Sequence, residues 1–257
     1  MTERVATRSR RDVGESRAHQ DIGAVTGQYL AEKQYSLFIP IYILVLYWTI
    51  SVIIVLFMGI KAGLPLPTVM QESNATYNTG AIMSLPYFLI VVGALCVNRQ
   101  FGAALAFGST RRDFWLGTMM GFIITSSIIG VFTMLGLAAE QWTNHWWFGV
   151  YAFDVAVLGS GNYGIAWCTM FILSLVSLLI GATYGTVFRS FGAKTLTVAI
   201  VVTSVVTLGI FAIFIWQSTA IIAFFAPWGY WTISAVLAAI CIVMSVVGYF
   251  VNQRAIV

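Results

Sequence analysis

The chain has 257 residues, of which 60% are hydrophobic and 9% are charged, and its formal net charge is +4. Soluble domains carry about 25% charged residues, so this composition excludes a water-soluble protein. The positive charge does not indicate nucleic-acid binding, because most basic residues precede the first apolar segment or lie in two short loops.

The amino-terminal region divides into two parts. Residues 1–24 are polar and mix arginines with acids, which predicts a mobile cytoplasmic tail that does not fold alone. Residues 25–37 place Val25 and Tyr35 among polar residues, which favours a short helix lying on the inner membrane face. Residues 25–257 are predicted to form one transmembrane domain.

Six apolar segments are long enough to cross a bilayer, for which a helix needs about 20 residues. They are approximately 38–60, 81–98, 115–138, 164–188, 196–217 and 229–251. The predicted fold class is therefore all-α, a polytopic membrane bundle of six transmembrane helices. Its three cysteines fall within these segments at unrelated spacings, which gives no metal-ligand pattern.

The loops between these segments predict the orientation. Lysine and arginine collect on the cytoplasmic side of membrane proteins. With the amino terminus in the cytoplasm, every lysine and arginine except Lys61 lies on that side. We therefore expect a multi-pass protein of a bacterial inner membrane, with both termini cytoplasmic.

The predicted outer side is rich in aromatic residues. Seven tryptophans map near the outer interface, where indole rings concentrate: Trp142, Trp146, Trp147, Trp167, Trp216, Trp228 and Trp231. The loop 139–163 is expected to rest partly on the outer leaflet. Residues 218–228 are too apolar for a free loop and too short to span, which favours a re-entrant or interfacial hairpin.

The sequence lacks the motifs of several kinds of chemistry. The predicted spans hold no central carboxylate or histidine, which makes a proton- or sodium-coupled carrier less favoured. Gly159–Gly164 matches a dinucleotide fingerprint, but it does not follow a strand, so we interpret it as a turn. No phosphate-binding Gly-Lys-Ser/Thr loop and no paired metal-binding histidines are present. The chain is not expected to be an enzyme, to bind a metal or to hold a cofactor itself.

Two pairs of glycines suggest close helix crossings. Gly117 and Gly121, and likewise Gly181 and Gly185, have the small-xxx-small spacing of tightly packed membrane helices. Packing within the chain is favoured over a contact between two copies.

The segment between the second and third predicted spans is the most informative. Phe101, Ala104, Leu105 and Gly108 follow helical spacing, which predicts a short amphipathic helix at the membrane base. Ser109 or Thr110 can cap the next helix, and Asp113 would sit near the positive end of its dipole. Arg111 and Arg112 are unfavourable at that end, which indicates another role for them, either topological anchoring or partner binding.

This segment resembles a region of a known family. The run from Ala106 to Phe114 (AFGSTRRDF) is similar to the coupling-helix region of type-2 ABC exporter permeases, between their second and third helices. The stretch from Gly181 to Lys194 (GATYGTVFRSFGAK) resembles the end of their fourth helix, where an Arg-x-Phe-Gly loop follows glycines. Helix count, cytoplasmic termini, the interfacial amino-terminal helix and the outer hairpin also match, so the resemblance covers about residues 25–251.

The resemblance implies a mechanism driven by a partner. Two permease subunits, identical or paralogous, would dock on two separate ATPase subunits that hold ATP and magnesium. The docking surface would be a short cytoplasmic coupling helix with its flanks: Phe101, Leu105, Phe107, Gly108, Ser109, Thr110, Arg111, Arg112 and Asp113. The expected substrate is amphipathic: a drug, lipid, peptide or antibiotic. An ion-coupled secondary carrier and a non-transporting membrane sensor or immunity protein remain as alternatives.

Overall fold

The computed structural model describes residues 22–216 and 230–253, and none of these residues forms a strand. Most of the predicted tail and the predicted hairpin at 218–228 lie outside the described residues. Residues 22–24 open a helix that runs to residue 31. The remaining elements are η1 (Gln34–Phe38), α2 (Ile39–Ala62), α3 (Thr68–Ala81), α4 (Ser84–Ala106), α5 (Arg111–Trp142), η2 (Ala156–Leu158), α6 (Tyr163–Trp216) and α8 (Tyr230–Gln253).

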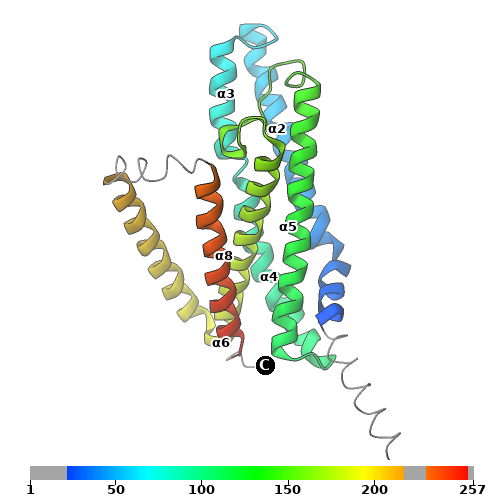
Figure 1. Cartoon of the computed structure of the whole chain (residues 1–257), viewed down its shortest axis with the longest axis vertical. Coiled ribbons are helices and arrows are strands. Elements are labelled where there is room, and N and C mark those ends of the chain that lie inside the picture. Colours follow the sequence, from blue (N-terminus) through cyan, green and yellow to red (C-terminus); the bar gives the residue numbers. More distant parts are fainter. Residues whose placement is uncertain (1–21, 217–229, 254–257) are drawn as a thin grey trace, which may run out of the picture.

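The described residues form a helical membrane bundle (Figure 1). Five helical stretches are long and apolar enough to span a membrane: Ser36–Ala62, Thr68–Ala106, Arg111–Trp142, Tyr163–Gly209 and Ser234–Gln253. The prediction of an all-α membrane protein is therefore confirmed at this level. The count of five differs from the predicted six because the fourth and fifth predicted segments belong to one element, α6.

A bend at Gly192 divides α6 into two arms. Gly192 has φ 81° and ψ 177°, a conformation that essentially only glycine adopts. The Tyr184 hydroxyl lies 2.7 Å from the Thr203 hydroxyl across the bend, so the arms lie side by side near it. Figure 1 shows the second arm running back toward the level at which the first arm begins.

The backbones of α4 and of the first arm of α6 are in direct contact. A Cβ on Gly181 would collide with the Ile90 carbonyl, and a Cβ on Gly185 would lie 2.8 Å from the Ala94 oxygen. On the facing helix, a Cβ on Gly93 would collide with the Leu178 carbonyl. The Gly181/Gly185 pair therefore marks packing within the chain, as predicted, because only glycine lets two backbones approach so closely.

Helix α3 is an element that the hydropathy pattern did not predict. Its sequence is polar, but Asn74 and Asn78 are 3% and 4% exposed. The Asn78 amide nitrogen donates to the Tyr151 carbonyl at 2.7 Å, and its oxygen accepts from the Ser51 hydroxyl at 3.1 Å. The Tyr151 backbone N–H donates to the Asn74 side-chain oxygen. These buried amides attach α3 to α2 and to the loop that follows α5.

Candidate functional site

Two helix caps build the corner between α4 and α5. Gly108 follows α4 with φ 89°, and its N–H donates to the Leu105 carbonyl at 3.0 Å. The Ser109 N–H donates to the Ala104 carbonyl at 3.1 Å. This is the Schellman arrangement, in which a left-handed glycine satisfies the last carbonyls of a helix. Gly108 therefore fixes the direction in which the chain leaves α4.

Thr110 caps the start of α5. Its hydroxyl accepts from the Asp113 backbone N–H at 3.1 Å and donates to the Asp113 carboxylate at 2.6 Å. The carboxylate lies in the first turn, where the helix dipole favours negative charge. Of the two predicted caps, Thr110 is therefore the one that the structure uses.

The expected separate amphipathic helix is not present, because residues 99–106 form the last turns of α4. The predicted docking residues consequently differ in exposure. Phe107, Gly108, Thr110 and Arg112 are exposed, Leu105, Arg111 and Asp113 are half-buried, and Phe101 and Ser109 are buried. Phe107 is 83% exposed. Phe101 and Ser109 contribute no exposed surface, so docking stays a prediction for the remaining residues.

Phe101 packs inside the chain, under Arg189 of α6. The carbon at the centre of the Arg189 guanidinium lies 3.4 Å from the centre of the Phe101 ring. The Phe114 ring meets the Phe101 ring edge-on, at 5.1 Å between centroids. A cation over an aromatic face is attracted by the ring quadrupole, and the attraction strengthens when water is excluded. Phe101 thus joins α4 to both α5 and α6.

Arg189 also bonds to two other helices. One guanidinium nitrogen donates to the Val97 carbonyl of α4 at 3.1 Å. The other donates to the side-chain oxygen of Asn252 in α8 at 2.8 Å. Arg189 is the arginine of the Arg-x-Phe-Gly stretch, three residues before the bend at Gly192. Side-chain bonds of this one residue therefore connect α4, α6 and α8.

Asn252 and Arg111 complete the network. The Asn252 amide donates to the Arg111 carbonyl at 2.9 Å, and the Arg111 guanidinium donates to the Gln253 carbonyl at 2.8 Å. The first turn of α5 is thereby attached to the last turn of α8. We call this end of the bundle, which carries Arg111, Arg189 and Asn252, the arginine end, and the opposite end the loop end.

The helix at residues 22–31 packs directly on α5. A Cβ on Gly117 would lie 2.7 Å from the Val25 Cβ, and a Cβ on Gly121 would collide with the Tyr29 ring. The Thr125 hydroxyl donates to the Tyr29 hydroxyl at 3.2 Å. Burial raises the pKa of the Tyr29 phenol above its ordinary value. The expected Gly117/Gly121 crossing is therefore made by this amino-terminal helix.

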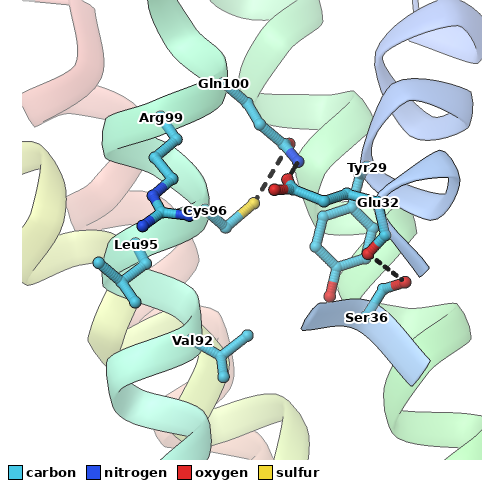
Figure 2. A pocket seen from close by; sticks show the side chains of 8 residues that line it. All are labelled: Tyr29, Glu32, Ser36, Val92, Leu95, Cys96, Arg99 and Gln100. Atoms are coloured by element: carbon cyan, nitrogen blue, oxygen red, sulfur yellow. Dashed lines mark hydrogen bonds between the residues drawn. The ribbon is translucent and has the colours of Figure 1, made fainter. Parts of the chain in front are cut away.

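A small pocket lies between the amino-terminal segment and α4 (Figure 2). The Gln100 amide donates to the Glu32 carboxylate at 2.9 Å, and the Cys96 thiol donates to the Gln100 side-chain oxygen at 3.3 Å. The pocket holds about 10 Å³, room for about one water molecule. It is too small for an organic substrate, so its bonds position the amino-terminal segment against α4.

At the loop end, Glu140 organises the loop after α5. The side chain is 0% exposed, and its carboxylate accepts N–H bonds from Ala152 at 3.2 Å and from Phe153 at 2.7 Å. Asp154 N–H also donates to it at 3.3 Å, and a His145 ring nitrogen lies 3.4 Å away. The sequence shows a glutamate at the end of an apolar helix, but not that the loop folds back over it. Its hydrogen bonds favour a structural role over a transport site.

Comparison with known proteins gives no relative: no protein-family model, curated protein or solved structure matches the chain. Functional interpretation therefore depends on the residues and their contacts.

Proposed function

We propose that the chain is the transmembrane permease subunit of an ATP-driven exporter of the type-2 ABC class, moving an amphipathic substrate across a cell membrane. One observation carries the proposal: the α4–α5 corner is exposed at Phe107 and Arg112, while Arg111 bonds to α8 and the Phe101 ring of α4 lies under Arg189 of α6. A force applied at this corner would reach four helices through short contacts.

The exposed corner suits a partner that binds through an aromatic anchor and a charge. Phe107 has most of its ring free to enter a pocket, and Arg112 beside it is exposed. Buried aromatic and arginine side chains dominate the binding energy of protein interfaces. A partner ATPase would offer an apolar pocket with an acidic rim.

The path of the force follows the network at the arginine end. Movement of the start of α5 would pull on α8 through Arg111 and Asn252. Movement of the end of α4 would reach α6 through the Phe101 ring and Arg189. Because Arg189 lies close to the bend at Gly192, the angle between the two arms of α6 is the natural conformational variable.

The proposed topology places the arginine end in the cytoplasm. Arginines near the end of α4, at the start of α5 and beside the bend of α6 then follow the positive-inside rule. The arms of α6 each exceed the about 20 residues that a span needs, so both would cross the bilayer and give six spans. Both termini would be cytoplasmic. The exposed apolar surfaces of the second arm and of α8 would face lipid and a second permease subunit.

Co-purification of the tagged chain with an ATPase that carries a phosphate-binding loop tests the proposal. We expect Phe107→Ala and Arg112→Glu to lower complex formation by about tenfold or more, because each removes an exposed anchor. Lys61→Glu, an exposed charge at the loop end of α2, is the matched control and should leave the complex intact.

Two results would contradict the proposal. One is unchanged complex formation and ATP turnover in both corner variants. The other is transport by the purified chain that persists without ATP and collapses with an ion gradient, which would favour the secondary carrier.

A further inference from the structure

The loop after α5, residues 143–162, begins with a turn of left-handed backbone. Four consecutive residues other than glycine, 144–147, have φ between 51° and 58°. The Trp147 N–H closes this turn by donating to the Thr143 carbonyl at 3.1 Å. Left-handed backbone is unfavourable for residues that carry a Cβ, so a run of it persists only where surrounding contacts hold it.

A buried pair of titratable groups supplies those contacts. His145 lies inside the left-handed turn, and its ring nitrogen is 3.4 Å from the Glu140 carboxylate. The same carboxylate accepts the N–H groups of residues 152–154. The His145 ring also stacks on Tyr151, at 4.0 Å between centroids. The Glu140–His145 pair therefore connects the strained turn to the segment that folds back over the end of α5.

The connection depends on one proton. The Glu140 side chain is 0% exposed and that of His145 is 23% exposed, so the pair exchanges its proton with solvent through the imidazole. With this proton, the imidazolium lies beside the carboxylate and attracts it. Without it, the carboxylate is a buried charge with no cation beside it, which is costly. Closure of the loop therefore becomes less favourable as the pH rises and the pair loses its proton.

The other titratable groups around the pair do not replace this cation. Asp154 and Tyr151 of the loop and Tyr47 of α2 face Glu140, and each of them becomes negative when it ionises. In the part of the chain that the structure describes, His145 is the basic side chain that pairs with Glu140. Imidazole is also the side chain whose charge ordinarily changes between pH 5 and 8.

The loop forms a wall of two largely apolar cavities. Ala156 and Val157 line a cavity of about 530 Å³ that α6 and α8 also line. Trp146 and Phe153 line a groove of about 310 Å³ between α2 and α5. Phe153 is one of the residues whose N–H bonds to Glu140, so release of the carboxylate would free the walls of both.

We propose that the loop after α5 is a pH-sensitive lid, which the Glu140–His145 pair holds closed while it carries a proton and which opens as the pH rises. The lid is separate from the α4–α5 corner and does not depend on the proposed ATPase partner.

Hydrogen exchange tests the lid. The purified full-length chain in lipid nanodiscs is followed by mass spectrometry between pH 5.5 and 8.5, with rates corrected for the intrinsic pH dependence of amide exchange. We expect the open fraction of residues 143–162 to rise about tenfold over this range, as a one-unit difference in the pair's proton affinity between closed and open loop gives. Peptides of α4 and of the first arm of α6 should not change.

Glu140→Gln isolates the charge from the hydrogen bonds. The amide oxygen still accepts N–H groups, but it carries no charge, so exchange of the loop should become independent of pH. Glu72→Gln, an exposed carboxylate of α3 at the same end, is the matched control and should keep the tenfold rise. If Glu140→Gln does not fold, His145→Gln should lower the rise instead.

Three results would overturn the proposal. The first is exchange of the loop that does not change with pH in the unsubstituted chain. The second is an undiminished rise in a folded Glu140→Gln or His145→Gln variant. The third is an equal rise in the peptides of α4 and α6, which would indicate opening of the whole bundle rather than of a lid.

Discussion

At the arginine end, the Asn252 side chain connects Arg189 of α6 to the start of α5. It is 1% exposed, accepts a hydrogen bond from Arg189 and donates one to the Arg111 carbonyl. Nothing in the local sequence near the end of α8 singles it out. Its role depends on α8 returning to the arginine end beside α5, and only the tertiary structure shows this.

Asn252→Ala tests this residue. The substitution leaves the Arg189 guanidinium and the Arg111 carbonyl each short of one partner, so we expect the free energy of unfolding to fall by about 1–3 kcal/mol. Gln253→Ala is the matched control, because Gln253 accepts from Arg111 through its backbone carbonyl and its side chain is exposed. Denaturant unfolding in detergent micelles measures both. Equal stability of the two variants would contradict the role given to Asn252.

Glu140 has the corresponding role at the loop end. Glu140→Leu would leave the N–H groups of residues 152–154 without their acceptor, so we expect the loop after α5 to open. Limited proteolysis should then cut within residues 143–162 at least about tenfold faster than in the unsubstituted chain. Glu72→Leu, on the exposed face of α3, should not change the rate. An unchanged rate in Glu140→Leu would show that the loop is held by its apolar contacts.

Among the helices, α6 is the element whose shape depends most on one residue. The bend requires φ 81° at Gly192, a conformation strained for any residue with a Cβ. A Cβ at this position has nothing within 4 Å, so the effect of an alanine would come from backbone strain rather than collision. The strain penalty for such a conformation is about 1–3 kcal/mol.

Gly192→Ala should therefore move the two arms of α6 relative to each other. Spin labels at positions 187 and 200, on either side of the bend, would report this as a longer or broader distance distribution. Gly209→Ala, in the second arm and also without a neighbour within 4 Å, is the control and should leave the distribution unchanged. An identical distribution in Gly192→Ala would mean that the bend does not depend on glycine.

The elements show where sequence reasoning succeeds and where it fails. Apolar runs locate the spans because a bilayer demands continuous hydrophobicity. The end of α4 was placed too early, since a polar exit from the membrane does not end a helix and the chain stays helical until the cap at Gly108. Helix α3 was missed because it is held by its own buried amides, those of Asn74 and Asn78, which bond to the backbone of Tyr151 in a distant loop. A hydropathy pattern does not record such contacts.

The candidate site shows the same division. Thr110 and Asp113 were predicted as cap and first-turn acid because capping is local in sequence. The burial of Phe101 was not predicted, since it depends on Arg189, which is far away in sequence and reaches back from α6. Helical spacing identified an apolar face at 101–108 but not whether that face meets a partner or the chain's own helices.

At the scale of the whole molecule, the two ends of the bundle differ in their hydrogen bonds and in their exposed residues. The arginine end combines an exposed corner with bonds that join four helices, whereas the loop end consists of a folded loop over Glu140 and a helix held by buried amides. In the part of the chain that the structure describes, the arginine end places the exposed Phe107 and Arg112 beside Arg111, which bonds to α8. We propose that this is the end at which a separate motor acts.

Site-specific photocrosslinking from position 107 in living cells tests this claim most directly. A photoreactive amino acid replaces Phe107, and another replaces Trp142 at the loop end as the control; both positions are exposed. We predict that position 107 crosslinks to a protein with a phosphate-binding loop and that position 142 does not. Crosslinks from position 107 only to lipid or to periplasmic proteins would contradict the account.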